Sequence, residues 1–222
     1  MSVLVYRDKA TACAAVATVV AAHIIEKPAS VLGLDYSDDL LLIYRALARM
    51  TADGLMDWGE VRAFGLSEYV RADAESSIQK MMASAIYDRA GIHRENRRHP
   101  DGNGTDWSIV CNDFEDAILN VGGLDTVLLS VRTDGSIAYN LGAPELAPVT
   151  HVERTSNGRV VTAGISTIMA AQKIVVLITG ADKATVAGRL LNGPIIPSVP
   201  ASYLQLHQNA IFILDEDAAS EI

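Results

Sequence analysis

The sequence predicts an α/β fold: one doubly wound, mostly parallel sheet with helices on both faces. Short, continuous apolar runs such as residues 173–179 are typical of strands that are buried on both faces of a parallel sheet. These runs alternate along the chain with longer segments of helical spacing, as expected for βαβ units. We find no repeat, linker or low-complexity segment, so residues 1–222 are expected to form one domain.

The apolar runs that predict strands are short and rich in Val, Ile and Leu. In chain order they occupy residues 3–6, 29–34, 61–64, 124–130, 173–179 and 210–214. The predicted helices have apolar residues three or four positions apart. They occupy residues 8–26, 39–50, 75–90, 106–120, 164–171 and 182–191. Asp182 is the expected N-cap of the last helix. Residues 93–105 are polar and residues 141–159 contain two prolines, so both segments are expected to be loops.

Composition and charge exclude several classes of function. Half of the residues are hydrophobic and 20% are charged, which is typical of a globular protein. The net charge of −9 gives no general attraction for nucleic acid or for an anionic membrane. The start of the chain lacks the basic region of a signal peptide, and the apolar residues 10–25 are short for a membrane span. We therefore expect a buried amphipathic helix there, in a soluble cytoplasmic protein.

Candidate metal ligands and disulfides are few. Cys13 and Cys111 are the only cysteines, and two isolated cysteines make neither a disulfide framework nor a zinc site. No spacing of His, Cys and Asp suggests a metal site. The sequence thus predicts neither a metal nor another cofactor.

Polar loops follow four of the predicted strands. They occupy residues 35–39, 65–69, 133–136 and 180–183. Ligands of open α/β sheets bind at the carboxyl ends of the strands. We therefore expect these loops to gather at one edge of the sheet.

Several motifs within these loops carry a resemblance to a known family. Residues 134–140 read Asp-Gly-Ser-Ile-Ala-Tyr-Asn, residues 67–70 read Ser-Glu-Tyr-Val, and residues 180–184 read Gly-Ala-Asp-Lys-Ala. Residues 200–207 read Pro-Ala-Ser-Tyr-Leu-Gln-Leu-His. In this order and spacing the chain resembles the glucosamine-6-phosphate deaminase/isomerase family, which is related to the 6-phosphogluconolactonases. The resemblance implies a Rossmann-like fold and a sugar-phosphate ligand.

The resemblance also implies that working parts of the family's reaction are substituted. That reaction is a proton shift between neighbouring sugar carbons followed by loss of ammonia. Ser67 stands at the position of the catalytic carboxylate base, and a serine hydroxyl cannot take a proton from carbon without activation. Ser136 stands at the position of the ring-opening histidine, and Leu141 replaces one of the carboxylates that orient it. Asp134, the other orienting carboxylate, is retained.

The expected phosphate site is altered as well. Lys183 matches a phosphate ligand of the family, but Asp38 and Asp39 stand in the phosphate loop. At contact distance and an effective dielectric near 20, the charge of each aspartate disfavours a bound phosphate by roughly several kcal/mol. The glycine-rich lead into residues 134–140 is replaced by Ser-Val-Arg-Thr at 130–133. Arg154 or Arg159 are the candidates to replace the family's phosphate-binding arginine.

Each candidate residue also has a structural interpretation. Asp134 with Gly135 suits a turn, and Asp38 and Asp39 suit the start of a helix. Lys183 is either an anion ligand or a solvated lysine in the first turn of a helix. Glu68 is either a displaced acid/base or a structural carboxylate.

Three functions remain open from the sequence. The first is a deaminase/isomerase-like protein of amino-sugar phosphate metabolism whose standard activity is altered or lost, with Asp134 and Glu68 as candidate catalytic residues and Lys183, Asp38, Asp39 and Gly135 as candidate ligand-binding residues. The second is a non-catalytic protein that binds a sugar or sugar phosphate, or serves as an oligomeric scaffold. The third is a 6-phosphogluconolactonase-like hydrolase. The expected partners are a small sugar or sugar phosphate and further copies of the chain.

Overall fold

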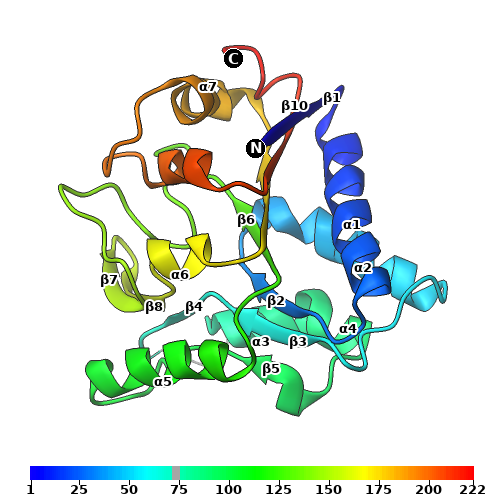
Figure 1. Cartoon of the computed structure of the whole chain (residues 1–222), viewed down its shortest axis with the longest axis vertical. Helices are drawn as coiled ribbons and strands as arrows, with labels where there is room; N and C mark the ends of the chain where they lie inside the picture. Colours follow the sequence, from blue (N-terminus) through cyan, green and yellow to red (C-terminus); the bar gives the residue numbers. More distant parts are fainter. Residues whose placement is uncertain (72–75) are drawn as a thin grey trace.

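A seven-stranded parallel sheet forms the centre of the molecule in the computed structural model, which describes residues 1–71 and 76–222 (Figure 1). The strand order is β1-β10-β9-β6-β2-β3-β5. The strands are β1 (Ser2–Tyr6), β2 (Val31–Leu34), β3 (Arg62–Gly65), β5 (Arg97–Arg98), β6 (Thr126–Ser130), β9 (Lys173–Ile178) and β10 (Ala210–Asp215). The predicted fold class is confirmed.

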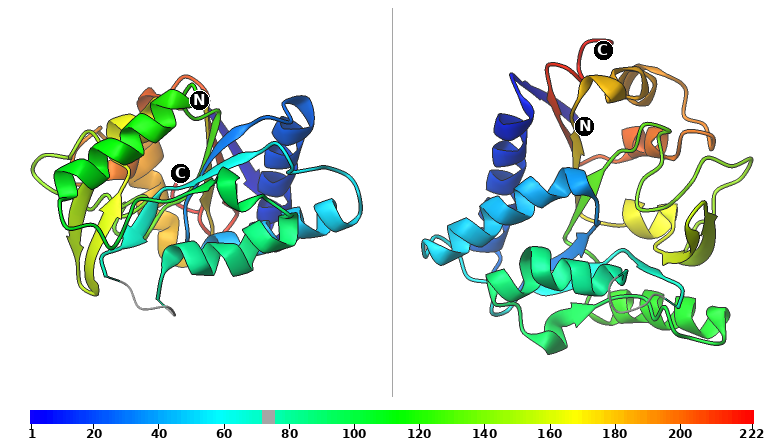
Figure 2. Two further views of the ribbon diagram at one scale, coloured as in Figure 1. Left: turned by 90° about the horizontal axis from the view of Figure 1, so that it is seen from below. Right: turned by 180° about the vertical axis from the view of Figure 1, so that it is seen from behind.

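Helices cover both faces of this sheet (Figure 2). One layer contains α1 (Lys9–Glu26), α2 (Leu41–Ala52), α3 (Ile78–Met82) and α4 (Asp88–Ala90), with a π-helical turn Ala83–Tyr87 between the last two. The other contains α5 (Trp107–Asn120), α6 (Ile165–Met169) and α7 (Ala184–Asn192). Alternate strand residues serve the two layers: Leu128 packs with the first and Val127 and Leu129 with the second. Two apolar cores therefore sandwich the sheet.

Helix α1 is the one segment of the described residues that is long and apolar enough to cross a membrane. In the structure it packs on the sheet beside α2, and Ala12, Val16, Val20 and Ile24 are buried. Asp8 caps its start by accepting a hydrogen bond from the Thr11 amide at 2.8 Å. The expected buried helix is therefore present.

Some predicted boundaries were wrong. Residues 141–159 were expected to be a loop, but they contain β7 (His151–Thr155) and the start of β8 (Gly158–Thr162). These strands and β4 (Ser67–Tyr69) form a three-stranded antiparallel sheet in the order β4-β8-β7. A tight turn at 156–157, followed by Gly158 with φ +124°, allows the hairpin to close.

Two other expectations also need correction. The expected loop at 93–105 contains a 3-10 turn, Arg94–Asn96, and the edge strand β5. Asp182 is not an N-cap, because the chain enters a 3-10 turn (Ala181–Lys183) directly after Gly180 and places Asp182 inside that turn. Helix 75–90 is present from Ile78, and its first expected residue lies outside the described residues.

The order of the strands fixes where a ligand can bind. From β2 the chain proceeds outwards to β3 and β5, whereas from β6 it proceeds in the opposite direction to β9 and β10. Loops that leave neighbouring strands in opposite directions open a crevice at the carboxyl ends of those strands. This switch point lies between Leu34, the last residue of β2, and Ser130, the last residue of β6.

Candidate functional site

The four polar loops meet at the carboxyl edge of the sheet, as their positions after the strands predict. Side-chain contacts join them in pairs: Ser37 with Ser130 (Oγ–Oγ 2.7 Å), Tyr69 with Tyr139 (Oη–Oη 2.8 Å) and Lys183 with Asp39. The loops after β2, β3, β6 and β9 therefore form one continuous site.

Asp39 is bonded to two lysines. Lys183 Nζ contacts Asp39 Oδ2, and Lys9 Nζ donates to Asp39 Oδ1 at 2.7 Å. The side chain of Lys183 is only 7% exposed. Burial raises the pKa of Asp39, but the hydrogen bonds from Lys183 and Lys9 outweigh this effect and lower it below the usual value. The Asp39 carboxylate thus forms an ion pair with the Lys183 ammonium group, which the sequence suggested as a ligand for an external anion.

The neighbouring Asp38 behaves differently. Its side chain is exposed at the start of the 3-10 turn Asp38–Leu40. The N-cap of this turn is Ser37, whose side chain makes no capping hydrogen bond, and both aspartates lie in the first turn, where the sequence placed them. The two aspartates, treated together in the sequence, therefore have separate environments.

Both substituted serines are buried at this edge. Ser67, at the start of β4, is 1% exposed, and Ser136 is fully buried. Within the described part of the chain, neither hydroxyl has a hydrogen-bond partner. A hydroxyl that makes no hydrogen bond to a base and has no access to solvent is not activated as a nucleophile or a base.

Glu68 is 6% exposed and serves the start of α3. Its carboxylate accepts hydrogen bonds from the backbone amides of Tyr69, Ile78 and Gln79 at 2.8–2.9 Å. It also accepts one from the Ser77 hydroxyl at 3.0 Å. These bonds use the acceptor capacity of both oxygens, and they favour the structural interpretation of Glu68 over an acid/base role.

Asp134 and Gly135 form a tight turn after β6. Asp134 Oδ1 accepts a hydrogen bond from the Ser136 amide at 2.8 Å, and Gly135 has φ +85°. A Cβ on Gly135 would lie 2.8 Å from Val199, so this turn has no room for a side chain. Asp134 also lines a pocket, so it has both a turn geometry and access to a ligand.

That pocket has a volume of about 420 Å³, within the range of small-molecule sites. It is lined by Tyr69, Arg132, Asp134, Tyr139, Leu141, Thr155, Ser156 and Asn157. The guanidinium carbon of Arg132 lies 4.0 Å from the centroid of the Tyr139 ring. The rings of Tyr69 and Tyr139 meet edge to face at 5.8 Å. We call this cavity the switch-point pocket.

The backbone holds Tyr139 in a conformation that side chains rarely adopt. Ala138 has φ +43° and Tyr139 has φ +60°. Left-handed non-glycine residues persist where neighbouring groups fix them. The side-chain amide of Asn140 donates to the backbone carbonyls of Ile137 (3.1 Å) and Ala163 (2.9 Å). The Thr162 hydroxyl donates to the backbone carbonyl of Ala138. The strained turn places the Tyr139 ring at the pocket wall.

A buried carboxylate lies behind this wall. Asp35 follows β2 and is 2% exposed, and its Oδ1 has no hydrogen-bond partner among the residues that the structure describes. Burial raises the pKa of Asp35 to about 6, although the charge of Arg132 opposes the shift. Buried, incompletely bonded carboxylates are concentrated at functional sites.

The structure adds residues that sequence reasoning missed: Arg132, Tyr139, Asp35 and Lys9. Arg132 and Asp35 carried a signal, because both lie within two residues of a strand's carboxyl end. The two candidate arginines are elsewhere: Arg159 lies over the Trp107 ring at 5.4 Å, and Arg154 is exposed on β7. Neither lines the switch-point pocket.

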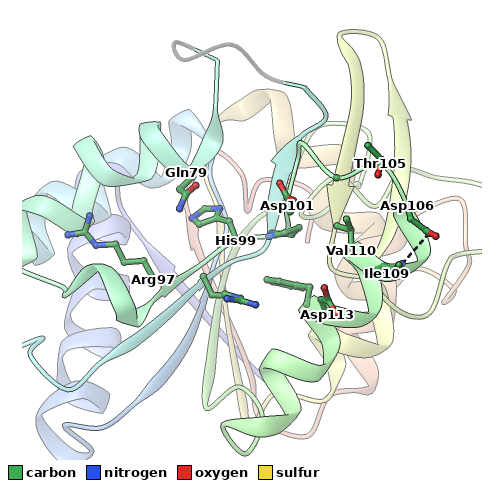
Figure 3. A pocket seen from close by; sticks show the side chains of 13 residues that line it. Gln79, Arg97, His99, Asp101, Thr105, Asp106, Ile109, Val110 and Asp113 are labelled. Carbon is green, nitrogen blue, oxygen red and sulfur yellow. Dashed lines mark hydrogen bonds between the residues drawn. The ribbon is translucent and has the colours of Figure 1, made fainter.

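A larger cavity, of about 510 Å³, lies between β5 and α5 (Figure 3). Figure 3 shows Gln79 and His99 on one side and Asp106 and Ile109 on the other. Arg98, Asp101 and Asp113 also line it, so its wall has mixed charge. None of the sequence-predicted site residues lines this cavity. We therefore place the candidate site at the switch-point pocket, despite its smaller volume.

Within residues 1–71 and 76–222, no group of three or more His, Cys, Asp or Glu side chains is arranged to hold a metal ion. The titratable and polar side chains at the site are carboxylates, lysines, Arg132 and tyrosine hydroxyls.

Comparison with known proteins gives one family. The family described as glucosamine-6-phosphate isomerases/6-phosphogluconolactonase matches residues 11–213. Glucosamine-6-phosphate deaminase of Arthrobacter sp. (strain FB24) is 34% identical over 88% of this chain and 83% of its own length. The deaminase of Clostridium novyi (strain NT) is 32% identical over the full length of both chains.

Solved structures agree with the sequence matches. A monomeric glucosamine-6-phosphate deaminase superimposes over the full length of both chains with a TM-score of 0.95 and 26% identity. The 6-phosphogluconolactonase of Trypanosoma brucei shares the fold. It has a TM-score of 0.81 and 21% identity, and the match covers all of this chain and 98% of that one. This chain belongs to the glucosamine-6-phosphate isomerase/6-phosphogluconolactonase family.

Proposed function

We propose that this protein is a divergent, glucosamine-6-phosphate deaminase-like member of its family that does not carry out the standard deamination and keeps a ligand pocket at the switch point. The observation that carries the proposal is the ion pair of Lys183 with Asp39. The side chain of Lys183 is 7% exposed, and its ammonium group, paired within the chain, is not available to a substrate phosphate unless that pair breaks.

The two serines give independent support. By resemblance, Ser67 and Ser136 stand where the reaction requires a carboxylate base and a histidine. Both hydroxyls are buried and make no hydrogen bond within residues 1–71 and 76–222, so neither is activated through such a bond. Leu141, at the position of an orienting carboxylate, lines the pocket with an apolar side chain.

The second candidate is a non-catalytic sugar-binding protein, and the polar and aromatic lining of the switch-point pocket favours it. A lactonase-like hydrolase is less well supported, because the related lactonases also use the histidine that Ser136 replaces. We further expect a soluble cytoplasmic protein that forms homo-oligomers. Light scattering tests the last expectation, which would fail if the protein has the mass of one chain.

The test of the proposed function is ammonia release from glucosamine 6-phosphate by the purified protein, beside the Arthrobacter deaminase. General acid–base groups contribute roughly 10²–10⁴-fold each, so the loss of two predicts a rate at least ~10⁴-fold below that of the relative. A rate within ~10⁴-fold of the relative would contradict the proposal. The Ser67→Ala/Ser136→Ala double variant is the control, and we expect it to give the same rate as the unmodified protein.

A further inference from the structure

Arg132 contacts an aromatic ring at the site and has no ion pair in the described part of the chain. Its side chain makes no hydrogen bond or ion pair with the described residues, although it is half-buried beside the Tyr139 ring. A guanidinium that lies against an aromatic ring is held in one plane, and its N–H donors at the edge remain free. In the switch-point pocket this edge is a prepared site for an acceptor with two oxygens.

The other cations at this edge are already paired. Lys183 and Lys9 both contact Asp39, and neither lines the switch-point pocket. Arg132 is therefore the positive charge that this pocket offers to a ligand. The anion-binding role that the sequence suggested for Lys183 has a new candidate in a different loop.

The charges around Arg132 limit which anion fits. Asp134 lines the same pocket, and Asp35 lies close enough for its charge to act on Arg132. A dianionic phosphate would meet one guanidinium and two carboxylates, and this surplus of negative charge repels a dianion more strongly than a singly charged group. A carboxylate has a single charge and the planar shape that the guanidinium fork accepts.

The rest of the pocket suits a ligand with several hydroxyl groups. Asp134 uses Oδ1 in its turn, which leaves Oδ2 to accept a hydrogen bond from a ligand hydroxyl. Ser156 and Asn157, at the tip of the β7–β8 hairpin, add exposed polar groups on the opposite loop. We propose that the switch-point pocket binds a sugar acid, with the ligand carboxylate on Arg132 and its hydroxyls on Asp134 and the hairpin tip. This proposal rests on the proposed function, because it assigns a ligand class to the same pocket.

Calorimetric titration of the full chain tests it with four probes: D-gluconate, D-glucuronate, D-glucose and glucosamine 6-phosphate. We expect at least one of the two acids to bind more tightly than glucose and than the phosphate ester. Arg132→Gln is expected to weaken acid binding roughly 10–100-fold, the usual contribution of a charged hydrogen bond. Arg132→Lys keeps the charge but loses the fork, so an intermediate loss is expected.

The matched control is Arg49→Gln, which removes one positive charge from an 85% exposed side chain on α2 and should bind as the unmodified protein does. Unfolding midpoints in urea verify that each variant is folded. If Arg132→Gln does not fold, the loss of acid binding in Arg132→Lys tests the proposal. The proposal would be overturned if neither acid binds, or if the two Arg132 variants bind the acids as tightly as the unmodified protein does. The proposal would also be overturned if glucose or glucosamine 6-phosphate binds as tightly as the acids. Ammonia release in the same titration would instead contradict the proposed function.

Discussion

Asp39 neutralises positive charge at the site, because its carboxylate forms ion pairs with both Lys9 and Lys183. A carboxylate in this position acts as an internal anion. The same two lysines would attract an external anion if Asp39 were neutral. A single substitution therefore separates the structural and the ligand-binding roles of these lysines.

We predict that Asp39→Asn lowers the free energy of unfolding by roughly 3 kcal/mol, because it leaves the buried Lys183 ammonium without its counter-charge. Urea unfolding measures the change. The control is Asp38→Asn, on an exposed side chain without an ion pair among the described residues, with an expected change within ~0.5 kcal/mol. Inorganic phosphate should stabilise Asp39→Asn and not the unmodified protein. Equal stabilisation of both proteins would show that Asp39 does not block an anion.

At the scale of elements, Glu68 joins β4 to the start of α3. The first amides of a helix lack partners within the helix, and here the carboxylate accepts from those of Ile78 and Gln79. The negative charge at the helix start is favourable as well. The family-like Glu-Tyr pair is therefore explained by a structural contact without an appeal to catalysis.

Glu68→Ala should lower the free energy of unfolding by about 2–4 kcal/mol, because several donors lose a charged acceptor at a buried position. Glu68→Gln keeps an acceptor and should lose about half as much. Glu60→Ala is the comparison and should be nearly neutral, because this exposed side chain makes no hydrogen bond or ion pair with the described residues. Urea unfolding gives all three values, and a Glu68→Ala protein as stable as Glu60→Ala would refute the structural role.

The elements differ in how well the sequence predicts them. The strands of the parallel sheet were predictable because both of their faces are buried, which requires continuous apolar runs. The β7–β8 hairpin was not, because His151–Thr155 is half-buried and mostly polar, and antiparallel pairing with β4 holds it. The loops of the site were predictable from their places after strands. The role of Arg132 was not, because it depends on the left-handed backbone of Tyr139, which no local pattern indicates.

For the whole molecule, the pKa values of two side chains, the half-buried His99 and the buried Asp35, shift in opposite directions. Burial lowers the pKa of His99 to about 4, although the carbonyl of Ser67 offsets part of this shift. Burial raises the pKa of Asp35 to about 6. The usual values are near 6.5 for His and 3.9 for Asp. Between about pH 4 and 6, the folded chain therefore carries a proton on Asp35 and the unfolded chain carries it on His99. The two contributions to the slope of stability against pH cancel.

Removal of either group should expose the contribution of the other. In Asp35→Asn only His99 remains, the unfolded state binds the extra proton, and stability should rise with pH by up to about 1.4 kcal/mol per unit relative to the unmodified protein. In His99→Gln only Asp35 remains, the folded state binds the extra proton, and stability should fall with pH by a similar amount. Urea unfolding at several pH values from about 4 to 6 measures these slopes. The double variant should run parallel to the unmodified protein. Two single variants with the same slope would show that these two side chains do not control the proton balance of folding.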